Sequence, residues 1–233
     1  MKVAAIIPAA GTGQRMQQHI PKQYLSFGGK PILAHTLTVL ENLPEIAEIT
    51  VVAQPSALDF CQTQVITPFG FKKVLRLVPG GKERQDSVYN ALKVLQRQNE
   101  WDLILVHDGV RPFVTPAEVL RVIRAAGEHG AAILALPAQD TVKKVNRAGR
   151  IKKTLNRQDI WLAQTPQVFQ TAIIWRAFLE AYAREYYGTD EASLVEALGL
   201  PVRVEPGSPF NIKVTTPEDL ILAEAIYRLR QQG

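Results

Sequence analysis

The sequence predicts an α/β fold in which helices cover both faces of a mostly parallel sheet, giving a three-layer sandwich. Two observations support this. Short apolar runs rich in β-branched residues recur along the chain, and stretches with helical spacing of apolar side chains lie between them. A length of 233 residues suits one such domain with a substantial core. We therefore expect residues 1–233 to form a single domain.

Strands are expected where a continuous apolar run has the length of a buried strand. These runs are Val3–Ile7, Ile49–Ala53, Val74–Val78, Leu103–Val106, Ala131–Leu136 and Val202–Val204. Because helical patterns separate them, crossover connections between parallel strands are the expected topology.

Helices are expected between the strands and at the end of the chain. Their ranges are Ile32–Asn42, Ser56–Val65, Arg84–Gln96, Pro116–Gly127, Thr171–Tyr186, Glu191–Leu198 and Pro217–Gln231. Thr115 before Pro116, and Thr216 before Pro217, each predict an N-cap followed by a proline in the first helical turn. Gly199 is expected to stop the helix that begins near Asp190.

One segment departs from this alternation. Residues 141–145 and 150–154 flank a turn at 146–149, which predicts a β-hairpin. It has too few apolar side chains to bury itself, so we expect residues 137–157 to form a projecting β-arm. An isolated hairpin is marginal in water, and the arm therefore needs a partner surface, most simply a second copy of the chain.

The first predicted strand ends in a glycine-rich turn. Its residues are Pro8, Ala9, Ala10, Gly11, Thr12 and Gly13. Such a turn exposes backbone N–H groups that can surround phosphate oxygens, and Arg15 and Lys22 follow it. A loop that holds a triphosphate, with two cations nearby, favours nucleotidyl transfer. A dinucleotide-dependent oxidoreductase is the alternative, but its fingerprint requires a third glycine where Met16 stands.

Composition narrows the class of protein. The net charge of +5 suits either a polyanionic small substrate or a nucleic acid. The hairpin region carries a cluster of cations: Lys143, Lys144, Arg147, Arg150, Lys152, Lys153 and Arg157. It lacks interleaved aromatic residues for stacking on bases, so a nucleic-acid-binding module is a remote alternative and no nucleic-acid partner is expected.

The sequence also bears on the compartment. Cys61 is the single cysteine, so no internal disulfide can form and a reducing cytoplasm is expected. The apolar run at the N-terminus is too short for a signal peptide, and no segment is long enough to span a membrane. No following domain is expected after residue 233.

Eight motifs in order resemble the 2-C-methyl-D-erythritol 4-phosphate cytidylyltransferase family, and the resemblance covers essentially the whole length. They are Pro8-Ala9-Ala10-Gly11-x-Gly13-x-Arg15-Met16, Pro21-Lys22-Gln23, Gly80-Gly81-x-x-Arg84-x-x-Ser87-Val88, His107-Asp108-x-x-Arg111-Pro112, Asp140-Thr141, Gln164-Thr165-Pro166-Gln167, Thr189-Asp190-Glu191-Ala192 and Asn211-Ile212-Lys213-Val214-Thr215. The first motif marks the wider sugar-nucleotidyltransferase superfamily, and the ordered set is far more specific.

The resemblance implies a Rossmann-like fold of the nucleotide-diphospho-sugar transferase type. It implies transfer of CMP from CTP to 2-C-methyl-D-erythritol 4-phosphate, with release of pyrophosphate. Mg²⁺ is implied as the cofactor, held mainly by the CTP phosphates and water rather than by protein ligands. The β-arm is implied to join two subunits into a homodimer.

The resemblance also implies roles for individual residues. Arg15 and Lys22 are expected to stabilise the transition state at the α-phosphorus. Nucleotide-binding residues are expected at Pro8, Ala9, Ala10, Gly11, Thr12, Gly13, Gly80, Gly81, Ser87 and Asp108. Substrate-binding residues are expected at Asp108, Arg111, Thr141, Arg157, Thr165, Thr189 and Lys213. Thr141 and Arg157 are expected to complete the site of the neighbouring subunit, and Thr189 could equally cap the helix near Asp190.

His107 is expected to be structural rather than a general base, because neighbours along a strand point to opposite faces. Lys82 departs from the acid that often occupies its position in relatives. The nearest rival function is a cytidylyltransferase acting on another polyol phosphate, such as ribitol 5-phosphate. The contexts of Gln164–Gln167 and Asn211–Thr215 favour methylerythritol phosphate.

Overall fold

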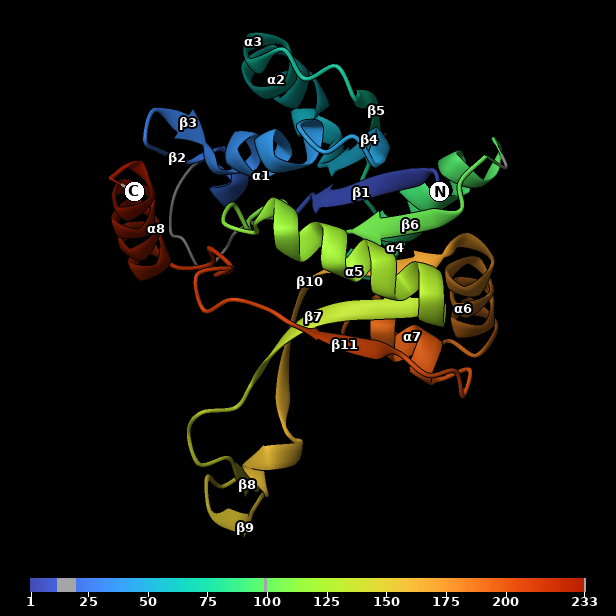
Figure 1. The fold of residues 1–233 in the computed structure, drawn as a ribbon, viewed down its shortest axis with the longest axis vertical. Helices are drawn as coiled ribbons and strands as arrows, with labels where there is room; N and C mark the ends of the chain where they lie inside the picture. The colour runs from blue at the N-terminus through green and yellow to red at the C-terminus, as the bar shows by residue number, and fades with distance from the viewer. Residues whose placement is uncertain (12–19, 99, 233) are drawn as a thin grey trace.

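A seven-stranded sheet crosses the computed structural model of the protein in the order β11-β7-β10-β6-β1-β4-β5 (Figure 1). The structure describes residues 1–11, 20–98 and 100–232. The strands are β1 (Val3–Ala9), β4 (Ile46–Ala53), β5 (Val74–Pro79), β6 (Leu103–Val106), β7 (Ala131–Pro137), β10 (Trp161–Gln170) and β11 (Arg203–Pro206). All of them run parallel except β10, which is antiparallel to both of its neighbours. The predicted mostly parallel sheet is confirmed.

Helices cover both faces of this sheet, as predicted. They are α1 (Ile32–Glu41), α4 (Arg84–Gln96), α5 (Pro116–His129), α6 (Thr171–Ala183) and α7 (Glu191–Glu196), while α8 (Pro217–Gln231) packs in a separate, smaller core. Strand β1 lies between two cores: Val3, Ala5 and Ile7 pack with α1 and α5, while Ala4 and Ile6 pack with α4, α6 and α7. Burial on both faces explains why the sequence of β1 is continuously apolar. Among the described residues, no helix is long and apolar enough to cross a membrane.

The predicted helix starts are confirmed for α5 and α8. Thr115 accepts a hydrogen bond from the backbone N–H of Glu118, and Thr216 accepts one from Asp219, each in a capping box with proline in the first turn. At α7 the N-cap is Asp190, whose side chain accepts from Ser193, so Thr189 is not the cap. Helix α7 ends at Glu196, and Gly199 follows with φ +73 in the left-handed region.

Strand β10 is the main element that the sequence patterns did not predict. At its centre Gln164, Thr165 and Gln167 surround Pro166, and these residues contradict an apolar strand pattern. All three polar side chains are nevertheless buried, because they form hydrogen bonds inside the protein. The pairing with β7 is irregular between Ala163 and Gln167, where the proline interrupts the ladder.

The predicted helix over Ser56–Val65 is more irregular than expected. A 3-10 turn at Pro55–Ala57 leads into α2 (Leu58–Cys61), a π-helical turn at Gln62–Ile66, and α3 (Thr67–Phe69). Gly70 ends this series with φ +66. The region is therefore helical, as predicted, but it consists of several short helical turns of different types rather than one regular α-helix.

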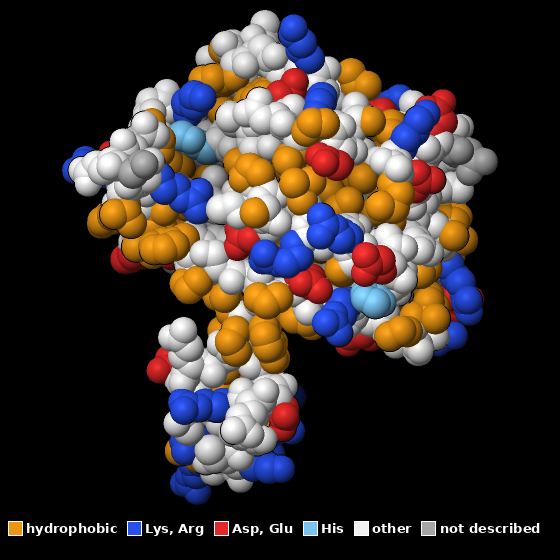
Figure 2. Space-filling model, viewed as in Figure 1, with side chains coloured by type: hydrophobic (Ala, Val, Ile, Leu, Met, Phe, Trp, Pro, Cys, Tyr) orange, Lys and Arg blue, Asp and Glu red, His pale blue; other side chains and the backbone are white. Residues whose placement is uncertain are grey.

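The predicted β-hairpin is present as β8 (Lys143–Val145) and β9 (Ile151–Thr154), and it projects from the ends of β7 and β10 (Figure 1). Every residue of both strands is exposed. Figure 2 shows the arm standing out from the body with Lys and Arg side chains along it. Val145 and Ile151 are 53% and 64% exposed, so packing against the described part of the chain does not explain their place on the arm.

A third, smaller core joins the ribbon of β2 (Ser26–Phe27) and β3 (Lys30–Pro31) to α8. Phe27 packs against Phe113 and Tyr227, with ring centroids 5.4 and 5.7 Å away. Gly28 has φ +52, and a Cβ there would lie 2.3 Å from the ring of Tyr227. Close approach of α8 to this ribbon therefore requires glycine at position 28.

Replacing Phe178 with alanine tests the core beneath α6. Phe178 is fully buried between α6 and the sheet. We expect Phe178→Ala to lower the free energy of unfolding by about 3–5 kcal/mol through lost burial and the cavity it leaves. Urea unfolding measures this. Leu179→Ala is the matched control, since Leu179 is 45% exposed on the same helix and should change stability far less; equal losses would contradict the packing described.

Candidate functional site

A cleft of about 500 Å³ opens at the carboxyl ends of the central strands. Pro8 and Ala9 of β1 line it, together with residues that follow β4, β5 and β6: Gln54, Gly81 and Asp108. Open α/β sheets bind ligands at this edge, because the loops after adjacent strands converge there. The strand ends therefore define the candidate site.

The described lining of the cleft carries more cations than carboxylates. Among the described residues, four cations line it: Lys22, Lys82, Arg84 and Lys213. Two carboxylates, Glu83 and Asp108, also line it. An excess of cations around a concave site suits a polyanionic ligand such as a nucleoside triphosphate.

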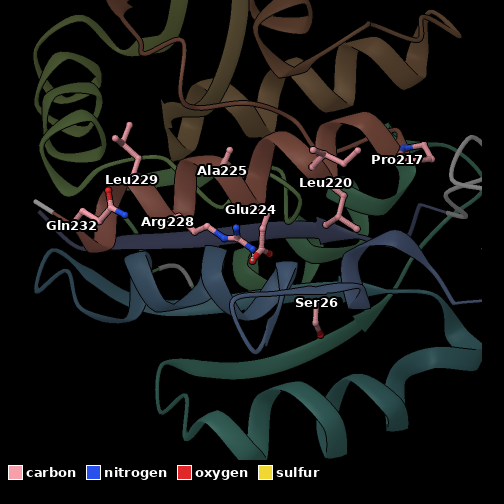
Figure 3. A pocket seen from close by; sticks show the side chains of 9 residues that line it. Ser26, Pro217, Leu220, Glu224, Ala225, Arg228, Leu229 and Gln232 are labelled. Carbon is pink, nitrogen blue, oxygen red and sulfur yellow. Dashed lines mark hydrogen bonds and ion pairs between the residues drawn. The ribbon is translucent and has the colours of Figure 1, made fainter.

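A larger depression of about 690 Å³ lies along α8, away from the cleft (Figure 3). Its lining is mostly apolar, and its two charged residues, Glu224 and Arg228, pair with each other at 3.3 Å. Figure 3 shows these two side chains next to one another on the helix, above Ser26. Among the described residues, one cation lines this depression and four line the cleft, so the cleft is the better candidate for binding a polyanion.

Gln23 fixes the loop that follows β1. It is 1% exposed, and its Nε2 donates hydrogen bonds to the carbonyl of Ala9 at 2.6 Å and to that of Gly11 at 3.4 Å. Lys22 precedes Gln23 in a short helical turn and lines the cleft. The buried amide therefore places Lys22 beside the loop. The predicted site residues Thr12, Gly13 and Arg15 lie outside the described residues.

The opposite wall of the cleft comes from the segment after β5. A Cβ at Gly80 would lie 2.4 Å from the Cβ of Ala10, so glycine lets this segment approach the first loop. The N–H of Gly81 donates to Ser87 Oγ at 3.1 Å, and that hydroxyl donates to the carbonyl of Glu83 at 3.1 Å. Gly81 and Ser87 thus belong to one hydrogen-bonded turn, and Gly80, whose N–H donates to the carbonyl of Ala53, sets the close approach to the loop.

Asp108 is the centre of an ion network at the floor of the cleft. Its Oδ1 accepts hydrogen bonds from Arg84 Nε at 3.3 Å and Nη2 at 3.2 Å. Its Oδ2 lies 2.8 Å from Lys213 Nζ and 3.6 Å from Arg111 Nε. Burial by itself would raise the pKa of Asp108, but Arg84, Lys213 and Arg111 together hold that pKa well below its ordinary value. The side chain of Asp108 is therefore ionised at neutral pH.

Thr165 and His107 form a buried chain of hydrogen bonds next to Asp108. The backbone N–H of Asp108 donates to Thr165 Oγ1 at 3.0 Å, and that hydroxyl lies 2.9 Å from His107 Nδ1. His107 Nε2 lies 3.1 Å from the carbonyl of Arg111, which can only accept, so Nε2 carries the proton and Nδ1 accepts from Thr165. Burial lowers the pKa of His107 to about 4. This neutral, fully buried imidazole agrees with the predicted structural role.

Asn211 ties the segment that carries Lys213 to β10. Its side chain is fully buried, and Nδ2 donates to the carbonyl of Thr165 at 2.9 Å. The carbonyl of Asn211 accepts from Arg111 Nη1 at 2.7 Å. Gln164 and Thr165 of β10 thus bind Asn211, and through Asn211 they fix the positions of Lys213 and Arg111 beside Asp108.

Five predicted substrate residues lie outside the lining of this cleft; of these, Arg111 and Thr165 contact Asp108, and the other three do not. Thr141, Arg157 and Thr189 are all exposed. Arg157 Nη1 donates to the carbonyl of Gln139 at 2.6 Å, at the base of the arm. Within one chain the structure brings together Lys22, Asp108, Arg111, Thr165 and Lys213, but not these three residues.

Sequence reasoning gave no role to Gln23, Arg84 or Glu191, although each stands in a quoted motif. Arg84 lines the cleft and pairs with both Asp108 and Glu191. Buried partners of this kind lie far apart in the sequence, so only their occurrence inside the motifs could have indicated them.

The glycines at 80 and 81, the cations around the cleft and the open α/β sheet are the features expected of an α/β nucleotidyltransferase. The family model described as 2-C-methyl-D-erythritol 4-phosphate cytidylyltransferase matches residues 3–229. A relative of that name from Syntrophus aciditrophicus (strain SB) is 52% identical over 232 residues, covering 100% of this chain and 98% of its own length. The chain belongs to the 2-C-methyl-D-erythritol 4-phosphate cytidylyltransferase family.

Solved structures agree with this assignment. The crystal structure of 2-C-methyl-D-erythritol 4-phosphate cytidylyltransferase from Thermus thermophilus has a TM-score of 0.79 at 35% identity, covering 98% of this chain and 100% of that chain. The structure of 4-diphosphocytidyl-2C-methyl-D-erythritol synthase from Anaerococcus prevotii DSM 20548 has a TM-score of 0.85 at 34% identity, covering 97% and 96%. The predicted family and three-layer α/β fold are confirmed.

The buried imidazole of His107 predicts a pH dependence of stability. In the unfolded chain the imidazole titrates near its ordinary pKa of 6.5, whereas burial keeps it neutral in the folded protein down to about pH 4. The unfolded state therefore binds an extra proton as the pH falls through this window, and stability falls with it. We expect the titration of His107 to lower the free energy of unfolding by about 2 kcal/mol between pH 7 and pH 5.

Urea unfolding of the wild type and His107→Gln at both pH values isolates the contribution of His107. The variant is expected to be less stable at pH 7 but to lose less stability on acidification. An equal acid-induced loss in both proteins would contradict a neutral buried His107.

Proposed function

We propose that the protein transfers CMP from CTP to 2-C-methyl-D-erythritol 4-phosphate, giving 4-diphosphocytidyl-2-C-methyl-D-erythritol and pyrophosphate. The observation that carries this proposal is the cation-lined cleft at the carboxyl edge of the sheet, in a chain of this family. A phosphate oxygen of the acceptor attacks the α-phosphorus of CTP, and the bond from that phosphorus to the pyrophosphate oxygen breaks. No nucleophilic side chain is needed, since the acceptor supplies the attacking oxygen.

The nucleotide is proposed to lie between the two walls of the cleft. The backbone of Pro8–Gly11 and the predicted residues 12 and 13 would surround the phosphates, while Gly80, Gly81 and Ser87 would face the cytosine. Small residues allow the backbone to approach a flat ring closely, and the crowding at Gly80 supports this arrangement.

Charge accumulates on the α-phosphate oxygens and the leaving pyrophosphate during transfer. Lys22 lies at the cleft beside the loop, where its ammonium group can stabilise that charge in the transition state. Arg15 is proposed to act with it, since a guanidinium can bind two oxygens at once.

The acceptor is proposed to bind over Asp108. Lys213 and Arg111 would hold its phosphate and direct one oxygen toward the α-phosphorus, while Asp108 accepts hydrogen bonds from sugar hydroxyls. Thr165 and Thr189 are the further predicted contacts, and the donor proton of Thr165 is already used on His107.

The arm is proposed to complete the site of a second subunit. Thr141 and Arg157 lie away from the cleft of their own chain, and the exposed Val145 and Ile151 need a covering surface. A homodimer in which each arm reaches the partner's cleft satisfies both requirements.

Mg²⁺ is proposed as the cofactor. No group of three or more possible ligands from His, Cys, Asp and Glu exists within residues 1–11, 20–98 and 100–232, and Asp108 is already paired with cations. The residues therefore suit an ion held mainly by phosphates and water, which would supply neutralisation of the triphosphate charge. A cytoplasmic location and the lack of a nucleic-acid partner stay predictions from the sequence.

Pyrophosphate release tests the function. The purified protein with CTP and Mg²⁺ is expected to release pyrophosphate with methylerythritol phosphate and much more slowly with ribitol 5-phosphate. Turnover with ribitol 5-phosphate alone would assign the chain to the rival acceptor, and no turnover of CTP with either acceptor would overturn cytidylyl transfer.

Lys22→Ala tests the proposed transition-state contact. We expect kcat to fall by about 10²–10³-fold, the usual effect of removing one preorganised donor, because the developing charge loses a fixed cation. Lys72→Ala is the control, since Lys72 is exposed and lies outside the cleft. Steady-state kinetics compare kcat in the two variants, and an unchanged thermal midpoint shows that both are folded. A near-normal kcat in Lys22→Ala would mean that Lys22 does not stabilise the transition state.

Arg157→Ala tests the arm. We expect the KM for the acceptor to rise more than that for CTP, because Arg157 is proposed to contact the acceptor phosphate from the partner subunit.

A mixture of Arg157→Ala and Lys22→Ala subunits then distinguishes the two subunits. A heterodimer has one site with both residues intact only if Arg157 acts across the dimer, so activity should recover to about a quarter of wild type after random exchange. Failure to recover in verified heterodimers would place Arg157 in its own subunit's site or outside any site.

A further inference from the structure

Glu191 is a buried carboxylate with an incomplete set of partners. It is 1% exposed at the first position of α7. Its Oε1 accepts a hydrogen bond from Arg84 Nη1 at 2.6 Å, while Oε2 has no partner among the described residues. Because burying a charge is costly, its retention here requires a compensating interaction, and Arg84 supplies it.

The guanidinium of Arg84 joins two carboxylates from different parts of the fold. Nη1 binds Glu191 of α7, and Nε and Nη2 bind Oδ1 of Asp108 after β6. Burial would lower the pKa of Arg84, but Glu191 and Asp108 raise it above its ordinary value. A planar fork can span both acceptors at once, whereas the ammonium group of a lysine is a single point charge.

The two oxygens of Asp108 therefore have different partners. Oδ1 is held by Arg84 from the protein side, and Oδ2 faces Lys213 and Arg111. Asp108 lines the cleft, and a carboxylate oxygen has two lone pairs, so Oδ2 can accept a hydrogen bond from a sugar hydroxyl of a bound ligand beside its cations. Oδ1 is held by Arg84 on the other side, which keeps the carboxylate in place for that bond.

We infer that Glu191 and Arg84 are positioning residues that hold Asp108 as the acceptor for a sugar hydroxyl of the bound ligand. This inference rests on the proposed function. Glu191 acts without touching the ligand. It holds the guanidinium of Arg84 in place, and that guanidinium holds the carboxylate of Asp108. The hydroxyl belongs either to the ribose of CTP or to the acceptor polyol, which share this chemistry.

Glu191→Gln and Arg84→Lys test the inference, with Arg228→Gln as the control. Glu191→Gln keeps the shape of the side chain but removes its negative charge. Arg84→Lys keeps the positive charge but removes the planar guanidinium that binds both carboxylates. Arg228 pairs with a carboxylate on α8, outside the cleft. Calorimetry measures binding of CTP and of 2′,3′-dideoxy-CTP, each with Mg²⁺ and without acceptor. Thermal unfolding confirms that each variant is folded.

If the ribose provides the hydroxyl, both test variants are expected to bind CTP about 10–100-fold more weakly, the range for a hydrogen bond to a charged group. Binding of dideoxy-CTP should change far less, since it lacks the hydroxyls. A merely structural defect would weaken both nucleotides equally.

If the acceptor provides the hydroxyl, nucleotide binding should stay near wild type while the KM for methylerythritol phosphate rises. Inhibition by inorganic phosphate, which lacks hydroxyls on carbon, should then be unchanged. The inference is overturned if both nucleotides weaken equally, if acceptor and phosphate weaken equally, or if both variants behave like Arg228→Gln. In each case a wild type that still releases pyrophosphate leaves the proposed function standing.

Discussion

The pairing of Asp108 with three cations is the interaction on which the candidate site depends. Arg84 comes from the start of α4, Arg111 from the turn after β6, and Lys213 from the segment before α8. Each of these segments would otherwise lie in a separate loop of the sheet edge. A single buried carboxylate gathers them, and a polyanion entering the cleft meets cations that are already converged. The network therefore links the stability of the sheet edge to the capacity of the cleft to bind phosphate.

Most of the fold could be predicted because its signals are local. The continuous apolar run of β1 and the capping boxes at Thr115 and Thr216 each depend on residues within a few positions. Strand β10 could not be predicted in this way, since Gln164, Thr165 and Gln167 satisfy their polar groups through the segment after β6, through α7 and through the segment at Asn211. A strand that buries hydrogen-bonded polar side chains carries no alternation of apolar and polar residues to detect.

The same distinction applies to the site. The glycine-rich turn after β1 and Lys22 follow a local grammar, and the structure places Lys22 at the cleft. Asp108 and Lys213, named from the family resemblance, lie 2.8 Å apart although they are distant in the sequence. Arg84 and Glu191 gave no local signal, because their importance arises only where α4 and α7 meet at the strand end. Thr141 and Arg157 lie on the arm, and their predicted role requires a second subunit.

The crystal structure of the protein soaked with CTP and Mg²⁺ tests the central claim most directly. The account predicts triphosphate density against the backbone of Pro8–Gly11, with Arg84 still bound to both Asp108 and Glu191. Nucleotide density in the α8 depression would contradict it. So would a nucleotide in the cleft with Arg84 withdrawn from Asp108.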